Sequence, residues 1–187
     1  MKTMITENTA LIIIDMQLGF DEPYWGKRNN PQAESNIQLL LHLWRKKDRP
    51  IIHVKHCSRE ENSPFRESFK GNDFKPEMSP VDNELVIKKS VNSAFIGTNL
   101  EKYLKSNGFE TLVIVGLTTD HCVSTTTRMA GNLGFSTILV SDATATFDRA
   151  GPNGVVYKAE EIHDIHLASL HNKFCEVCTT KSLVQEG

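Results

Sequence analysis

The chain has 187 residues, which is enough for one domain with a sizeable core and marginal for two. Hydrophobic residues make up 39% of the chain and charged residues 24%, values that are ordinary for a soluble globular protein. The formal net charge is −2, so the chain lacks the excess of basic residues that would attract nucleic acid or an anionic membrane, and neither partner is expected.

The first residues carry no targeting signal. Residues 1–7 lack the basic-then-apolar order of a signal peptide. The longest apolar run, Ala10–Ile14, is far too short to span a bilayer, but its β-branched residues favour a strand that is buried on both faces. We therefore expect a cytoplasmic protein with a single domain over residues 1–187, without internal repeats or a linker.

Apolar blocks alternate with helical patterns along the rest of the chain. Asn30 and Pro31 predict the start of a helix, as N-cap and first-turn proline, and apolar residues continue the helical spacing to Trp44. Further helices are predicted from a Thr98–Glu101 capping box to Asn107, from about His121 to Leu133, and over Lys158–Lys173. The other predicted strands are Pro50–Val54, Leu85–Ile87, Thr111–Val115, Thr137–Val140 and a short one around Val177.

This alternation predicts an α/β fold. Strands that alternate with helices imply right-handed crossovers and a mostly parallel sheet covered on both faces. We expect a three-layer α/β/α sandwich of Rossmann-like architecture with five or six strands. Ligands bind beyond the carboxyl ends of the strands in such sheets. The residues expected to share that rim are Asp15, Lys88, Lys89 and Gly116–Cys122.

Cys122 is the candidate nucleophile. A strand, a turn and a helix place it in the first helical turn, where the helix dipole and the free N–H groups favour a thiolate. The same N–H groups could hold a developing oxyanion. Asp15 is a candidate base at the neighbouring strand end, and Lys89 or Lys88 could stabilise both negative groups.

Four segments resemble the isochorismatase-like cysteine hydrolases, a family that includes nicotinamidases, N-carbamoylsarcosine amidohydrolases and ureidoacrylate amidohydrolases. The similarity runs from Ala10 to about Thr180. The four segments are Ala-Leu-Ile-Ile-Ile-Asp-Met-Gln at 10–17, the run from Lys89 to Leu100, Gly-Leu-Thr-Thr-Asp-His-Cys-Val at 116–123, and Ser-Asp-Ala-Thr-Ala-Thr at 141–146. Each motif is weak alone, but together they stand in the family's order on the predicted strand ends.

The resemblance implies a catalytic triad of Asp15 as base, Lys89 rather than Lys88 as the lysine, and Cys122 as nucleophile. It also implies a cis peptide bond between Leu117 and Thr118, with the N–H groups of Thr118 and Cys122 as the oxyanion hole. The implied function is hydrolysis of an amide, ureido or carbamoyl C–N bond of a small molecule through a Cys122 thioester. By resemblance, we expect a homo-oligomer, a dimer or larger.

Substrate specificity is expected from residues 18–30 and 56–84, where the chain shows little regular pattern. We place Phe20 and Trp25 beside Leu117 and Thr118 among the oxyanion-hole and substrate-binding residues. Other loop aromatics could equally wall a pocket or anchor the loops; they are Phe65, Phe69 and Phe74.

Neither a metal nor another cofactor is expected. In the nicotinamidase branch, a metal site is built from an Asp-x-His pair and a later histidine after the second strand. Here that region, Ile51–Cys57, contains His53 and His56 but no aspartate. This departure argues against a bound zinc and against nicotinamide as the substrate.

Alternatives stay open beside the amide hydrolase. One is a vinyl ether hydrolase of isochorismatase type, in which Cys122 is a bystander, although that branch typically lacks the cysteine. Another is a non-catalytic binding or redox module that uses Cys175 and Cys178, which would point to opposite faces of a strand. His163 and His166 could bind a metal, but we expect them on a solvated helix face.

Overall fold

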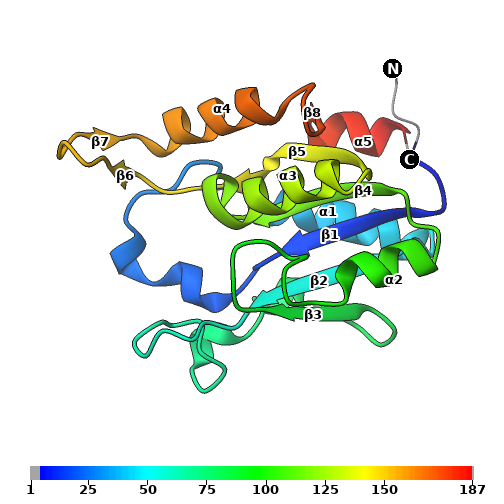
Figure 1. Ribbon diagram of the computed structural model, residues 1–187, viewed down its shortest axis with the longest axis horizontal. Helices are drawn as coiled ribbons and strands as arrows, with labels where there is room; N and C mark the ends of the chain where they lie inside the picture. The colour runs from blue at the N-terminus through cyan, green and yellow to red at the C-terminus, as the bar shows by residue number, and fades with distance from the viewer. Residues whose placement is uncertain (1–4, 187) are drawn as a thin grey trace.

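The apolar, β-branched runs of the chain form a parallel sheet at the centre of the computed structural model, which describes residues 5–186 (Figure 1). The strands are β1 (Thr9–Ile14), β2 (Ile51–His56), β3 (Leu85–Lys89), β4 (Thr111–Leu117), β5 (Ser136–Ala145) and β8 (Glu176–Cys178). They lie in the order β3-β2-β1-β4-β5-β8, and every neighbouring pair is parallel. The parallel sheet is confirmed, with six strands.

Helices cover both faces of this sheet, which confirms the three-layer fold. The helices are α1 (Ala33–Lys46), α2 (Leu100–Ser106), α3 (Ser124–Asn132), α4 (Ala159–Leu170) and α5 (Thr180–Glu186). Apolar residues of α1 and α5 pack on one face, and those of α2, α3 and α4 pack on the other. Within residues 5–186, none of the helices is both long and apolar enough to cross a membrane.

The core follows from the alternation of side chains along each strand. In β1, Leu11 and Ile13 join the cluster beneath α1, while Ile12 and Ile14 join the cluster beneath α2 and α3. Trp44 of α1 is fully buried, and its indole N–H donates to the carbonyl of Thr9 over 2.9 Å. A run that is apolar at every position is therefore what a strand between two helical layers requires.

Two predicted helix starts are wrong. Helix α1 begins at Ala33, whereas Asn30 has a φ of +43° and its Nδ2 donates to the carbonyls of Ser141 and Thr144 at 3.0 and 2.7 Å. Asn30 thus ties its loop to β5 instead of capping α1. The Thr98 capping box is also absent, because its hydroxyl donates to the carbonyl of Ala94 over 2.6 Å and Asn99 is the N-cap.

Two irregular segments lie beyond the carboxyl ends of β1 and β2. Their regular pieces are short 3-10 turns at Leu18–Asp21, Pro23–Trp25, Lys70–Asn72 and Pro76–Met78. Gln17 joins these segments, because its amide donates to the carbonyls of His56 and Asn72 and accepts from the His56 N–H at 2.8–3.0 Å. The loops are therefore fixed above the same edge of the sheet. A small antiparallel pair, β6 (Arg149–Ala150) and β7 (Val156–Tyr157), projects at one end of the molecule (Figure 1).

Candidate active site

The structure brings the three predicted catalytic side chains together at the carboxyl edge of the sheet. Asp15 directly follows β1 with a φ of +51°, Lys89 ends β3, and Cys122 lies in a π-helical turn after β4. The Lys89 ammonium donates to Asp15 Oδ2 over 2.6 Å and lies 3.2 Å from the Cys122 sulfur. All three residues are buried. A carboxylate, an ammonium and a sulfur from distant parts of the chain therefore meet at one point.

The charges of this group depend on its burial. Burial alone would lower the pKa of Lys89, but the Asp15 carboxylate and the Cys122 sulfur raise it above its usual value, so the lysine stays protonated. Burial raises the pKa of the Cys122 thiol, and the Asp15 carboxylate raises it further against the opposing effect of Lys89. Burial thus opposes the thiolate that the helical turn was expected to favour, and the thiol needs a base to become a nucleophile.

Asp15 is placed to act as that base. Its Oδ1 is buried and has no hydrogen-bond partner among residues 5–186, while its Oδ2 is held by Lys89. A carboxylate oxygen of Asp15 lies within 4.8 Å of the Cys122 sulfur. One oxygen of the carboxylate is thus available to accept a proton inside the site.

His56 is a fourth member of this group that sequence reasoning did not assign. It ends β2, and its Nδ1 lies 3.1 Å from the Lys89 ammonium. Burial, together with the charge of Lys89, lowers the pKa of His56, so its neutral ring accepts a hydrogen bond from the lysine. The rule that strand ends share one rim applies to β2 as well, and it would have indicated this histidine.

These residues do not fit a metal ion. Asp15, His56 and Cys122 offer three potential ligand atoms within 4.8 Å of one another, but the Lys89 ammonium already lies between them at 2.6 to 3.2 Å. His53, the other histidine of β2, faces away from this group and pairs with Glu84 over 2.8 Å. The cation at the centre of the site is the protein's own lysine.

The turn that carries Cys122 begins at the Leu117–Thr118 peptide bond, where the resemblance implied a cis bond and where the bond is cis. Leu117 is fully buried, whereas Thr118 lines the cavity next to Cys122. Burial would raise the pKa of Asp120 in this turn, but its ion pair with Arg149 at 2.7 Å holds the pKa well below its usual range. The turn that carries Cys122 is therefore held in place by an ion pair to Arg149.

His163 also braces this turn, which corrects the expectation of a solvated helix face. It is 5% exposed, and its Nδ1 lies 2.9 Å from the hydroxyl of Thr119. Its Nε2 lies 3.4 Å from the amide of Asn30. The histidine thus joins α4 to the turn after β4 and to the loop before α1.

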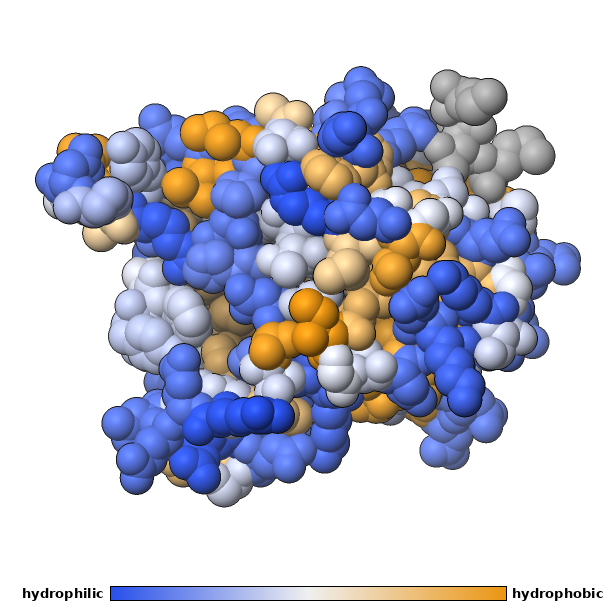
Figure 2. All heavy atoms as spheres, in the orientation of Figure 1, coloured by the Kyte–Doolittle hydropathy of each residue, from blue (hydrophilic) through white to orange (hydrophobic). Residues whose placement is uncertain are grey.

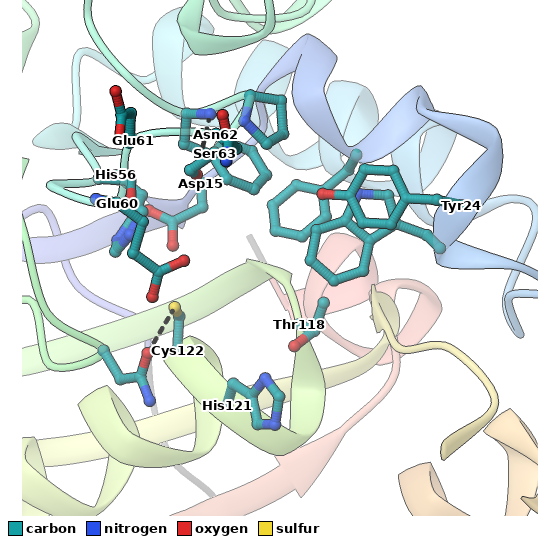
Figure 3. A pocket seen from close by; sticks show the side chains of 16 residues that line it. Asp15, Tyr24, His56, Glu60, Glu61, Asn62, Ser63, Thr118, His121 and Cys122 are labelled. Atoms are coloured by element: carbon teal, nitrogen blue, oxygen red, sulfur yellow. Dashed lines mark hydrogen bonds between the residues drawn. The ribbon is translucent and has the colours of Figure 1, made fainter. Parts of the chain in front are cut away.

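The group opens into a cavity of about 590 Å³ (Figure 3). Phe20 and Trp25 line it as expected, and so does Phe65, whereas Phe69 is exposed on the surface and Phe74 packs against His53. The other lining residues are Asp15, Tyr24, His56, Ser58, Glu60, Glu61, Asn62, Ser63, Pro64, Asn92, Thr118, His121 and Cys122. Loops 18–30 and 56–84 therefore supply most of the wall.

The C-terminal cysteine pair does not form a comparable site. Cys175 packs in the core cluster beneath α3 and α4, while Cys178 packs against the cluster on the opposite face of the sheet. All four cysteines lie within the described residues, and none forms a disulfide. Burial raises the pKa of Cys175 to about 12. These positions argue against a redox module built on the pair.

Comparisons with known proteins point to one family and one fold. The model of the Isochorismatase domain matches residues 9–182. YrdC of Bacillus subtilis, an uncharacterized isochorismatase family protein, is 51% identical over 180 residues, which is 96% of each chain. The crystal structure of a protein from Chromobacterium violaceum, described as a hydrolase of the isochorismatase family, superposes with a TM-score of 0.95 at 42% identity, covering 100% of this chain and 98% of that one. The N-carbamoylsarcosine amidase of Arthrobacter is 39% identical over 108 residues, 58% of this chain and 37% of the amidase.

Proposed function

This chain belongs to the isochorismatase family of hydrolases, and from that premise we propose that it cleaves a C–N bond of a small amide-like molecule through a thioester on Cys122. The observation that carries the proposal is the buried Lys89 ammonium, which contacts both the Asp15 carboxylate and the Cys122 sulfur beside the cavity. The similarity to an N-carbamoylsarcosine amidase supports this bond type.

In the first half of the reaction, Asp15 takes the thiol proton and the Cys122 sulfur attacks the carbonyl carbon. The positive charge of Lys89 stabilises the negative charge while that negative charge shifts from the Asp15 carboxylate to the Cys122 sulfur. The oxyanion accepts hydrogen bonds from the N–H groups of Thr118 and Cys122, each worth about 3–4 kcal/mol in comparable enzymes. Asp15 then returns the proton to the nitrogen, the C–N bond breaks, and the amine or ammonia leaves.

In the second half, water hydrolyses the thioester. Asp15 accepts a proton from the water as its oxygen attacks the acyl carbon, and the same N–H groups hold the second oxyanion. The C–S bond then breaks, the proton returns to the sulfur, and the acid is released. Lys89 remains protonated throughout because its neighbours raise its pKa.

The test is a comparison of two cysteine variants. Cys122→Ala should abolish ammonia release from a panel of small amides, ureas and carbamoyl compounds, whereas Cys57→Ala, which removes a half-buried thiol outside the cavity lining, should retain it. Hydroxylamine added during turnover should yield the hydroxamate of the acyl group with the wild type. Amide cleavage that survives in Cys122→Ala would rule out the thioester. Cleavage of a vinyl ether by that variant would favour the isochorismatase-type alternative.

A further inference from the structure

Two carboxylates lie at the cavity wall without a counter-charge. Glu60 and Glu61 both line the cavity and are exposed to solvent. Neither side chain forms an ion pair or a hydrogen bond with any residue in the range 5–186. Figure 3 shows Glu60 on the wall above Cys122, with its carboxylate directed toward the sulfur. The negative charge of these residues is thus available to a ligand.

The described lining of the cavity holds no permanently charged cation to pair with the anionic group of a ligand. No lysine or arginine is among the described residues that line it. Lys89 lies beneath the floor, its side chain is 0% exposed, and it is held by Asp15, His56 and Cys122. His56 is neutral because burial and Lys89 lower its pKa, and His121 faces Asp120 at 3.5 Å.

The wall opposite the glutamates is aromatic. The rings of Tyr24 and Trp25 lie 4.8 Å apart, and Phe20 lies 5.3 Å from Trp25. The indole N–H of Trp25 donates to the carbonyl of Gly19 over 2.8 Å, which fixes the ring. Aromatic faces are electron-rich and attract cations, and carboxylates nearby add a Coulombic attraction. Burial raises the pKa of Tyr24, and the nearby carboxylates of Glu22 and Glu60 raise it further.

We propose that the substrate of this hydrolase carries a cationic group, of the alkylammonium class, which binds between Glu60, Glu61 and the Tyr24–Trp25 rings while its carbonyl lies at Cys122. The inference rests on the proposed function and names its substrate class. Asp15 is already neutralised by Lys89, so the two loop glutamates are the charges left for a ligand to balance. A substrate with a carboxylate would meet two like charges and no lysine or arginine among the described lining residues.

The experiment uses three carboxamides that share one chain of two methylene groups and end in a trimethylammonium, a tert-butyl or a carboxylate group. The first two match in shape and differ in charge. We expect the wild type to cleave the trimethylammonium amide with a kcat/KM about tenfold above that of the tert-butyl amide, and the carboxylate amide most slowly. The double variant Glu60→Gln with Glu61→Gln should lose about tenfold toward the cationic amide and less than about twofold toward the tert-butyl amide.

Glu67→Gln is the matched control, because Glu67 is an exposed glutamate of the same loop that pairs with Lys88 outside the cavity lining. It should leave the ratio of the cationic to the neutral amide unchanged. A wild type that prefers the carboxylate or tert-butyl amide, or a double variant with an unchanged ratio, would overturn the inference.

A failure of the proposed function is distinguishable from a failure of the cation site. If none of the three amides is hydrolysed, the amide chemistry fails, and calorimetry with benzyltrimethylammonium still tests the site. Binding to the wild type that weakens about tenfold in the double variant supports the cation site. Absence of binding, or equal binding to both proteins, overturns it.

Discussion

The central residue of the site is a lysine that works through its charge. A buried carboxylate and a buried thiol that must lose its proton would repel each other without a cation between them. Lys89 supplies that cation at hydrogen-bond distance from both, and its raised pKa keeps it charged. The same burial makes the group costly to disturb, because removing one member leaves the other charged without compensation.

Replacing Lys89 by methionine should therefore destabilise the fold as well as stop the reaction. We expect a loss of about 3–5 kcal/mol in the free energy of unfolding, since Asp15 is left as an unpaired buried carboxylate. The double variant Asp15→Asn with Lys89→Met removes both charges and should recover most of that loss without recovering amide hydrolysis. Urea denaturation with an ammonia assay measures both, and losses that simply add in the double variant would contradict the coupling.

Sequence reasoning at this scale located two of the three strand-end residues of the site, missed His56 at the end of β2, and on the loops reached aromatic residues but not the carboxylates. Asp15 and Lys89 lie at ends of apolar strands, where one topological rule places every side chain at the same rim. Glu60 and Glu61 lie on an irregular loop, whose path depends on contacts such as those of Gln17 rather than on any local pattern. The helical turn was expected to favour a thiolate at Cys122, but burial, which raises the pKa of this thiol, is invisible to a helix-dipole argument.

At the level of the elements, the carboxylate of Glu84 connects a helix, a strand and a loop on the side of the sheet away from the active site. Its carboxylate accepts from Arg45 of α1 at 2.7 and 2.8 Å, from His53 of β2 at 2.8 Å and from the N–H of Val81 at 3.0 Å. Burial would raise the pKa of Glu84, but these donors lower it to about 2. Helix α1, the inner strand β2 and the loop that leads into β3 thus share one ionised carboxylate.

Glu84→Gln should lower stability by on the order of 2 kcal/mol at neutral pH. Because the folded pKa of about 2 lies below the ordinary value of 4.5, this contribution is complete above about pH 4.5 and is lost as the pH falls toward about 2. The difference in urea midpoint between wild type and variant should therefore shrink from pH 7 to pH 3. Glu101→Gln is the control, since its exposed pair with Lys105 should contribute less than about 0.5 kcal/mol. A difference that is independent of pH would count against the assigned ionisation.

The close approach of β1 and β4 depends on a glycine. Gly116 pairs with Ile14 at the end of both strands and has a φ of +119°. A Cβ added there would lie 2.1 Å from the Ile14 carbonyl oxygen, so the strands would have to separate beside Asp15. The strands that lead to Asp15 and to the turn of Cys122, both proposed as catalytic, are in this way held at a fixed distance.

Gly116→Ala should cost more than about 3 kcal/mol and abolish activity, because both the positive φ and the contact with Ile14 oppose a side chain. Gly134→Ala separates the two causes, since Gly134 also has a positive φ, of +90°, but no atom within 4 Å of an added Cβ. It should cost about 1 kcal/mol and preserve activity. Equal losses in the two variants, read from thermal unfolding, would show that the contact with β1 is unimportant.

For the whole molecule, the strength of each local pattern decided how well the fold could be predicted. The central strands β1 and β4 are apolar throughout because helices cover both of their faces, and such runs are readable in sequence. The start of α1 was misplaced because Asn30 donates hydrogen bonds to carbonyls of β5. These carbonyls lie far from Asn30 along the chain, so no local sequence pattern indicates the contact. Figure 2 shows hydrophilic side chains over much of one face, with smaller apolar groups between them. A surface of this kind carries little information about which segments lie side by side.

The sheet order predicts how protection against hydrogen exchange is distributed. β1 and β4 lie in the middle of six strands with their residues almost wholly buried, whereas the two-residue strands β6 and β7 project with Val156 and Tyr157 exposed. We expect the amides of β1 and β4 to exchange several orders of magnitude more slowly than those of β6 and β7, with the edge strand β3 between them. Exchange followed by mass spectrometry of peptides measures this order. Slow amide exchange in β6 and β7 that does not depend on protein concentration would contradict the prediction. Exchange that becomes slower as the protein concentration rises would instead indicate that a second copy covers the projecting pair, as the expected homo-oligomer allows.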